Sequence, residues 1–545
     1  MKVGLDFLLL IICFPFWTNS QSSLTKNELL GGFLPERIHW DLLHYDYTIE
    51  VNPKTKTITG FNQISFKLLS PLTRMQVDLH DNFTVDSIKW NNLNLKYERF
   101  HWSLFIQIPQ LPIDSREQIV VYYHGKPPIA KNAPWDGGYV TKLDKNGKYL
   151  AGMAVQGEGS NMWLPTKDGQ SDEPDEGVRA NIIVPNDLVA VSNGRLIKKE
   201  ESGHDKTKWT WEIVNPINSY CITFNIGDYV EIKDKYKELD LTYFVLRDHK
   251  ERAEKQFTAV PEMISIFEKH FGPYPFPEDG YKLVETSFAG MEHQSNIAYG
   301  NNFKNGYGGY GNEVARRFDF ILIHESAHEW FGNSITSRDI SDMWIHEAFT
   351  TFAEFVYVEE KWGYDDMLNY VTQVVGGITL EAPIIGRPAC NHKGDTDMYY
   401  KGAMMLQTLR HHLQNDSLFF ASIKGFATQF KKQIIETEDV IQYFSEQLNQ
   451  DLRPFFLTYL TQTHLPELVI TKGKEVYFQK VQPGFQMNIP LSIGRKKKYF
   501  TISDTPQVIK GVFFPNFNSE KQVLDNSKWP SVLKYLITNQ YLLQK

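Results

Sequence analysis

The run His324-Glu325-Ser326-Ala327-His328 places two histidines four residues apart, with a glutamate beside the first. In an α-helix, side chains four residues apart lie on one face, one turn from each other. His324 and His328 can therefore direct two neutral imidazole nitrogens at one ion. Glu325 points elsewhere on the helix but stays within reach of a water molecule on the same ion. The run predicts a helix that carries a metal centre.

This metal centre needs a third ligand, because a catalytic zinc ion is held by three side chains and keeps a fourth position open. Glu347 follows His328 after eighteen residues, within residues 342–350, which are predicted to form a second helix. A short turn at residues 337–339 lets this helix fold back antiparallel and brings Glu347 beside both histidines. The pattern indicates a zinc metalloprotease, and the alternative is a surface helix that matches the motif by chance.

Length and composition set the frame for the rest of the chain. Its 545 residues are enough for about three domains of roughly 150–200 residues each. The hydrophobic content of 42% and the aromatic content of 14% can fill substantial cores, which argues against a disordered protein. The mild net charge of −8 argues against nucleic acid as a partner.

The first twenty residues have a positive start, an apolar run at residues 7–17 and small residues before Ser20. This pattern predicts a signal peptide over residues 1–20 and an exported protein, periplasmic or extracellular. The alternatives are a buried N-terminal helix and a lipid anchor at Cys13, which the bulky Ile12 before it disfavours. The apolar run is too short to cross a membrane comfortably, and no other span is expected after signal removal. The cysteines that remain, two in number, cannot form a disulfide framework.

From residue 45 to about residue 240, apolar and polar positions alternate between turn residues, which is typical of short strands in an antiparallel sheet. Strands are expected at residues 45–51, 57–66, 105–108, 118–123, 180–184, 208–213 and 220–226. The sequence therefore predicts a large antiparallel β domain over residues 21–240.

Helical spacing takes over after residue 240 and predicts a mostly helical domain over residues 241–463. Within it we expect a strand at residues 282–285, a glycine-rich loop at 306–311, and helices at 251–271, 403–413, 418–429, 437–448 and 454–461. From Pro466 the pattern returns to short strands at residues 468–471, 476–478 and 485–491, with a terminal helix near 531–540. This predicts a small β domain over residues 464–545, and the fold class is multidomain α+β.

Three further motifs accompany the metal run. They are Phe288-Ala289-Gly290-Met291-Glu292-His293, Tyr399-Tyr400-Lys401-Gly402-Ala403, and Gln156 followed by Trp163-Leu164-Pro165, Asp168 and Asp172-Glu173-Pro174. Together with the metal set they resemble the aminopeptidase N family of zinc gluzincin peptidases over most of residues 40–465. The resemblance implies that the helical domain is thermolysin-like. It also implies one zinc ion held by His324, His328 and Glu347, with Glu325 as the general base and Tyr399 stabilising the oxyanion.

The resemblance further implies that the substrate is a peptide with a free N-terminus. Glu292 is expected to bind its ammonium group, with Gln156 assisting from the β domain. The remaining substrate contacts are expected from the rest of the first motif: Ala289, Gly290, Met291 and His293. Ala289 and His293 depart from the family pattern, which has Gly and Asn there, and we expect His293 to titrate near neutral pH.

The family's long C-terminal helical domain has no counterpart in this sequence, so the site is expected to be less enclosed than in the larger members. The function that follows is a zinc-dependent aminopeptidase that hydrolyses the N-terminal peptide bond. One alternative is a zinc endopeptidase of the thermolysin type, which lacks the amine anchor. The other is a non-catalytic, zinc-bearing peptide-binding protein, which would need neither Glu325 nor Tyr399.

Overall fold

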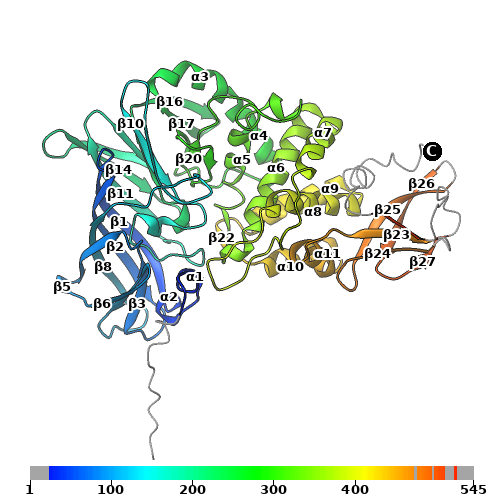
Figure 1. The fold of residues 1–545 in the computed structure, drawn as a ribbon, viewed down its shortest axis with the longest axis horizontal. Coiled ribbons are helices and arrows are strands. Elements are labelled where there is room, and N and C mark those ends of the chain that lie inside the picture. The colour runs from blue at the N-terminus through cyan, green and yellow to red at the C-terminus, as the bar shows by residue number, and fades with distance from the viewer. Residues whose placement is uncertain (1–23, 472–474, 494–495, 510–520, 525–545) are drawn as a thin grey trace, which may run out of the picture.

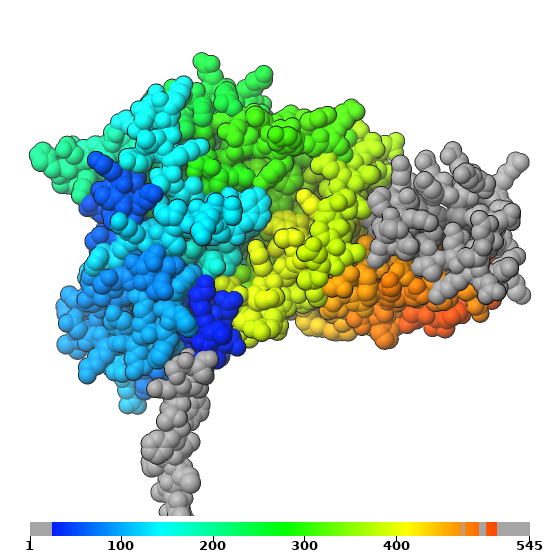
Figure 2. All heavy atoms as spheres, in the orientation of Figure 1, coloured from blue at the N-terminus to red at the C-terminus, as the bar shows by residue number. Residues whose placement is uncertain are grey.

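A computed structural model describes residues 24–471, 475–493, 496–509 and 521–524. A β-rich part comes first, a helical part lies in the middle, and a small group of strands lies at the far end of the molecule (Figure 1). In the space-filling view the first two parts are in direct contact (Figure 2). The predicted fold class, multidomain α+β, is confirmed. The predicted signal peptide and the predicted terminal helix near residues 531–540 lie outside the described residues.

The first part is built on an eight-stranded sheet with the order β13-β14-β11-β1-β2-β8-β4-β5. Its pairs are antiparallel as predicted, except that β1 and β11 run parallel. In β1, alternate side chains are buried, which is the period expected of a strand that covers a core. The strands are β1 (Trp40–Asn52), β2 (Thr57–Leu68), β4 (Phe83–Trp90), β5 (Leu93–Asn94), β8 (Arg116–Gly125), β11 (Val178–Pro185), β13 (Arg195–Glu201) and β14 (Lys206–Ile213).

Two smaller sheets pack on the same apolar core. They are β12-β15-β10-β9 and β3-β7-β6, with β3 (Arg74–Asp78), β6 (Tyr97–Phe100), β7 (Ser103–Gln107), β9 (Gly138–Leu143), β10 (Tyr149–Ala154), β12 (Val189–Ser192) and β15 (Phe224–Gly227). Trp163 joins the layers, since its ring meets Tyr47 and Phe224 edge-on. The strand predicted at residues 220–226 is shorter, because Asn218 caps a 3₁₀ turn over Ser219–Cys221. Short helices α1 (Lys26–Gly31) and α2 (Pro35–Ile38) precede the sheet.

The helical part also contains a five-stranded sheet, β16-β17-β18-β20-β19. Its strands are β16 (Tyr229–Tyr236), β17 (Leu239–Leu246), β18 (Tyr281–Glu285), β19 (Gly290–Met291) and β20 (Ile297–Tyr299). The boundary predicted at residue 240 therefore lies inside β17. The single helix predicted at 251–271 is divided into α3 (Lys250–Gln256) and α4 (Val260–Phe271). Pro261 lies in the first turn of α4 and has no N–H to donate backwards, so the two helices do not merge.

The remaining helices form the centre of the molecule (Figure 1). They are α5 (Phe320–Ala327), α6 (Trp344–Trp362), α7 (Tyr364–Val375), α8 (Asp397–Leu413), α9 (Asp416–Gln429), α10 (Thr437–Leu448) and α11 (Arg453–Thr461), with a parallel pair of short strands, β21 (Ile335–Ser337) and β22 (Gln433–Ile435). Gly402 on α8 lies directly against Ala348 on α6: a Cβ at position 402 would be 2.6 Å from the Ala348 Cβ. The absence of a side chain at this point lets α6 and α8 approach closely.

The last strands are β23 (Glu467–Thr471), β24 (Glu475–Gln479), β25 (Gln486–Ile493), β26 (Lys496–Ser503), β27 (Gln507–Val508) and β28 (Lys521–Leu524). They form a four-stranded sheet, β27-β24-β23-β28, and the β25-β26 pair. The ring of Phe485 stacks on that of Phe455 in α11, with centroids 6.0 Å apart. The strands are thereby attached to the helical part at a distance from the metal motif.

Replacing Gly402 by Ala should force α8 away from α6 and lower the melting temperature, because overpacking of this kind costs about 1–3 kcal/mol. Thermal unfolding followed by circular dichroism measures the change. In the double variant Gly402→Ala/Ala348→Gly the opposing methyl group is absent. The melting temperature of this variant should therefore lie close to that of Ala348→Gly alone. A Gly402→Ala melting temperature equal to that of the unmodified chain would contradict the close helix contact.

Candidate active site

Helices α5 and α6 bring the three predicted ligands together in the interior. Asp319 caps α5 by accepting from the Leu322 N–H, and α5 carries His324 with His328 directly after its last residue. Glu347 comes from the first turn of α6. Its Oε2 atom lies 3.6 Å from His324 Nε2 and 3.4 Å from His328 Nε2, and the two Nε2 atoms are 3.3 Å apart.

The geometry of this group fits a zinc ion. Ligand atoms that each lie about 2.0–2.1 Å from a tetrahedral zinc are roughly 3.3–3.4 Å from one another. Both carboxylate oxygens of Glu347 are buried and have no hydrogen-bond donor, although a buried polar group normally finds one. Burial disfavours the charge on Glu347, yet the adjacent His328 and His324 hold the pKa of its carboxyl below the usual range. We call His324, His328 and Glu347 the metal group.

Hydrogen bonds behind the two histidines fix which nitrogen faces the centre. His324 Nδ1 lies 2.6 Å from Glu354 Oε1, and His328 Nδ1 lies 2.9 Å from the Phe331 carbonyl oxygen. A carboxylate and a carbonyl can only accept, so each Nδ1 carries the proton and each Nε2 keeps a free lone pair toward the ion. Glu354 is held in turn by the Tyr370 hydroxyl, which donates to its Oε2 at 2.5 Å.

Glu325 lies beside the metal group on the same helix. Its side chain is buried, and burial raises the pKa of its carboxyl to about 8. Gly290 leaves room for it, because a Cβ at position 290 would collide with the Glu325 carboxylate. The carboxylate therefore occupies a fixed position between α5 and strand β19.

Tyr399, on α8, approaches the metal group from another direction. Its ring stacks beside that of His324 with centroids 5.9 Å apart. Burial raises the pKa of its phenol well above the usual value, so the hydroxyl stays protonated and can donate a hydrogen bond at neutral pH. Gln156, which follows β10, donates from Nε2 to the Tyr399 hydroxyl at 3.4 Å. The β-rich part thus contributes directly to the site.

Glu292 follows β19 and points toward the same centre. Ligand atoms of Glu292, Glu325 and His328 lie within 4.8 Å of one another. The Glu292 Oε1 atom is buried without a hydrogen-bond partner, and burial raises the pKa of the carboxyl. A buried carboxylate oxygen without a partner can bind a cationic group of a ligand.

A cavity of about 510 Å³ opens onto these groups. The predicted residues that line it are Gln156, Ala289, Gly290, Glu292, His324, Glu325, His328 and Tyr399. Two predicted substrate contacts are not among its lining residues, because the Met291 and His293 side chains are buried in the interior. Burial lowers the pKa of His293 to about 3, so the titration near neutral pH expected for this ring does not occur.

The cavity also has walls that the sequence did not indicate, among them Trp135, Tyr307, Tyr310, Phe320, Tyr370 and Tyr400. The position of Phe320, one helical turn before His324, could have been used to find it. Glu354 could have been found in the same way, since it lies two turns after Glu347 on α6. Trp135 and the two tyrosines of the 306–311 loop reach the cavity through tertiary folding alone.

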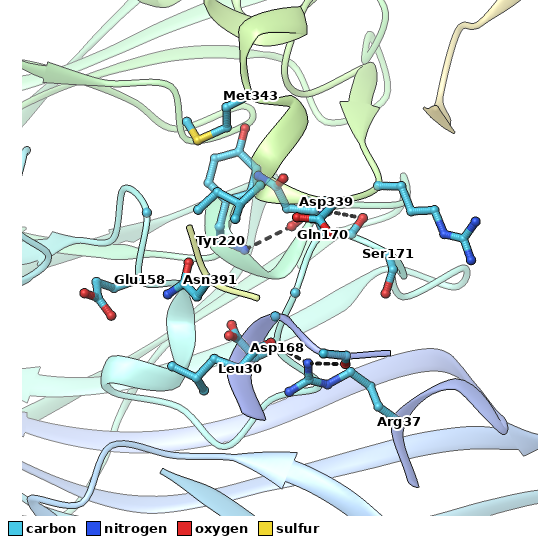
Figure 3. Close-up of a pocket in the computed structure, with 18 of the residues that line it drawn as sticks. Leu30, Arg37, Glu158, Asp168, Gln170, Ser171, Tyr220, Asp339, Met343 and Asn391 are labelled. Atoms are coloured by element: carbon cyan, nitrogen blue, oxygen red, sulfur yellow. Dashed lines mark hydrogen bonds between the residues drawn. The ribbon is translucent and has the colours of Figure 1, made fainter. Parts of the chain in front are cut away.

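A second cavity, of about 50 Å³, lies between the β-rich and helical parts and is large enough for water only (Figure 3). Arg37 and Asp168 line one side, and Asp339 and Met343 line the other (Figure 3). Nearby, the Thr336 hydroxyl donates to Glu173 at 3.1 Å, and the Ser337 hydroxyl donates to Gln170 at 2.9 Å.

These bonds fasten the segment after Gln156 to strand β21, which lies between α5 and α6. The motif residues Asp168 and Glu173 therefore lie in the contact between the two parts, away from the large cavity. Among the residues that the structure describes, no helix combines the length and the apolar character needed to cross a bilayer.

Comparisons with known proteins agree with this arrangement. The chain is 25% identical to aminopeptidase Ey of Gallus gallus over 297 residues, which are 50% of this chain and 30% of that protein. It is 21% identical to probable aminopeptidase 1 of Sulfurisphaera tokodaii over 440 residues, or 77% of this chain and 54% of that protein. The chain thus spans no more than about half the length of these relatives.

The fold is shared with the crystal structure of an M1 zinc metallopeptidase from Deinococcus radiodurans. The TM-score is 0.64 at 18% identity, covering 78% of this chain and 95% of that one. Residues 42–221 match the peptidase M1 N-terminal domain, and residues 256–459 match the peptidase family M1 domain. Since the two matches together take in more than half of the sequence and meet at the cavity that holds the metal group, the chain belongs to peptidase family M1.

Proposed function

We propose that this chain is an exported, zinc-dependent aminopeptidase that holds one zinc ion and removes the N-terminal residue of peptides. The observation that supports it most directly is the buried Glu292 side chain. Its Oε1 atom has no hydrogen-bond partner, and a carboxylate oxygen of Glu292 lies within 4.8 Å of ligand atoms of Glu325 and His328. Relatives that bear the name aminopeptidase support the same activity. Export rests on the charge and apolar pattern of residues 1–20.

The metal group would hold the zinc ion, which when bound supplies Lewis acidity and lowers the pKa of water toward about 7. Glu325 accepts a proton from the attacking water and passes it to the departing amine. Tyr399 donates its hydroxyl proton in a hydrogen bond to the oxyanion of the tetrahedral intermediate. Glu292 binds the free ammonium group of the substrate, assisted by Gln156, which lines the same cavity.

The position of Glu292 limits where the peptide can be cut. With its ammonium group on Glu292, a peptide has room for only one residue before its carbonyl reaches the metal group. The rival activity, a zinc endopeptidase, uses the same base and oxyanion donor but has no need of a carboxylate at position 292. The two activities therefore differ in their response to the free amine of the substrate.

Replacing Glu292 by Gln should lower kcat/KM for peptides with a free N-terminus roughly 10- to 100-fold, because a charge-assisted hydrogen bond contributes about 1.5–3 kcal/mol. Residue release is followed by mass spectrometry, with Glu313→Gln as a surface control. N-acetylation of the peptide should abolish cleavage by the unmodified chain. Equal cleavage of free and acetylated peptides would establish the endopeptidase instead.

Glu325→Gln and Tyr399→Phe should each reduce kcat on a panel of aminoacyl fluorogenic amides, about 100-fold or more, without a comparable change in KM. Both groups are expected to act on the reacting atoms, whereas substrate binding rests on other residues. A zinc chelator should abolish the activity of the unmodified chain. A peptide-binding protein without catalysis would bind the panel and turn over none of it.

Glu354→Gln should weaken zinc binding about 10- to 100-fold, because a neutral amide accepts more weakly from His324 Nδ1–H than a carboxylate does and can turn its NH2 group toward the ring. Zinc affinity measured by competition with a chelating dye reports this effect independently of activity. Glu360→Gln is the matched control on the same helix, since Glu360 pairs with Lys269 and His270 at the surface. Equal zinc affinities of the two variants would contradict a role for Glu354 in metal binding.

A further inference from the structure

We propose that this enzyme also selects substrates by their second residue, binding an aromatic or large apolar side chain after the cut on a shelf formed by Tyr307, Tyr310 and Phe320. The inference rests on the proposed aminopeptidase function and deepens it. We call these three residues the aromatic shelf.

The glycine-rich loop that holds two of the three residues is a tight hairpin. Tyr307 N–H donates to the Tyr310 carbonyl at 3.1 Å, and Tyr310 N–H donates back to the Tyr307 carbonyl at 3.0 Å. Gly308 and Gly309, between them, have φ angles of 62° and 97°. Two consecutive positive φ values are what such a two-residue turn requires, and glycine adopts them without strain. The turn therefore fixes the backbone positions of both tyrosines relative to each other.

This hairpin is anchored to the start of the helix that carries the metal ligands. Asn301 donates from Nδ2 to the Gly306 carbonyl at 2.8 Å and to Asp319 Oδ1 at 2.6 Å, and it accepts from the Gly308 N–H at 2.7 Å. Asp319 is the same residue that caps α5. A peptide bound at the metal group would therefore have a defined position relative to this hairpin.

Ring contacts connect the shelf to the metal group. The Tyr307 ring meets Phe320 edge-on with centroids 5.6 Å apart, and the Phe320 ring stacks beside His324 at 5.3 Å. All three shelf residues line the large cavity. Tyr310 is 80% exposed and Tyr307 is 42% exposed, so both rings have faces available for contact. Large aromatic faces turned into a cavity are typical of a binding surface.

The shelf lies on the side of the metal group that the departing part of the substrate would occupy. A carboxylate oxygen of Glu292, which would hold the ammonium group, lies within 4.8 Å of ligand atoms of His328 and Glu325, whereas Phe320 of the shelf stacks on His324. Burial raises the pKa of the Tyr307 phenol, and the negative charge of the nearby Glu325 raises it further. Glu325 is the group that would protonate the leaving amine. The residue attached to that amine therefore faces Tyr307 and Phe320.

The chemistry of this region favours aromatic and apolar side chains. Apart from Glu292, Glu325 and the two histidines, the residues that line the cavity include no Asp, Glu, Lys, Arg or His. A charged side chain placed there would lose water without gaining an ionic partner. An aromatic side chain would bury apolar area and could meet Tyr307, Tyr310 and Phe320 in edge-on or stacked contacts.

The test compares the tripeptides Leu-Phe-Gly, Leu-Ala-Gly and Leu-Asp-Gly, with the release of leucine measured by mass spectrometry. The unmodified zinc-loaded chain should hydrolyse Leu-Phe-Gly with a kcat/KM about 10- to 100-fold above that for Leu-Asp-Gly. Tyr310→Ala should lower the Phe-to-Ala ratio about 3- to 10-fold, while Tyr310→Phe should preserve it. Tyr97→Ala, a remote exposed tyrosine on β6, is the control and should leave the ratio unchanged.

Because Tyr310 is largely exposed, its replacement should not prevent folding, and Tyr307→Ala is a second variant with the same expected effect. Preferences at the first position, measured with a series X-Phe-Gly, should be the same in all variants. Leucine release at similar rates from all three tripeptides would overturn the shelf and leave the aminopeptidase intact. An unchanged Phe-to-Ala ratio in both alanine variants would also overturn it. Release of no leucine at all, with cleavage at internal bonds of longer peptides, would overturn the aminopeptidase and the shelf together.

Discussion

The positions of the protons on the His324 and His328 rings determine whether both Nε2 atoms can bind a metal ion. Glu354 and the Phe331 carbonyl each accept from an Nδ1–H, which leaves both Nε2 lone pairs directed at Glu347. Three further carboxylates, those of Glu292, Glu325 and Glu354, are buried in the same region. Burial without donors disfavours the charged form of these carboxyls, and a bound cation would restore it. Metal binding and the stability of this part of the fold are therefore coupled.

The helix contacts around the centre follow from this requirement. Glu347 can reach the histidines only if the chain between α5 and α6 makes a compact reversal. β21 and the Asp339-capped turn after it supply that reversal, and β21 is held by its pairing with β22. On the other side, Gly402 admits α8 to within contact of Ala348, the residue after Glu347. That approach is also what brings Tyr399 beside His324. One closely packed helix pair thus places both Glu347 and Tyr399 beside the two histidines.

Local periodicity and ligand spacing could predict much of this arrangement, because both act over a few residues. The positions of His324 and His328 follow from one helical turn, and α10 occurs as predicted because its apolar spacing is regular. The helix predicted at residues 251–271 is interrupted because Pro261 removes a backbone donor. The prediction followed the apolar periodicity and gave this local effect too little weight. The approach of Trp135 and Tyr310 to the cavity depends on contacts between distant segments, and no local pattern encodes such contacts.

The motif Gly290-Met291-Glu292-His293 shows where a simple rule could have gone further. Residues 290 and 291 form a strand, and side chains on a strand alternate between its two faces. Gly290 and Glu292 line the cavity, whereas Met291 and His293 are buried on the other side. Applied to residues 290–293, this alternation would have separated the two residues that line the cavity from the two that pack behind them. On the buried side, the His293 ring has no hydrogen-bond partner for either nitrogen. The ring is enclosed by protein, and burial lowers its pKa, so it packs behind the chain segment that carries Glu292.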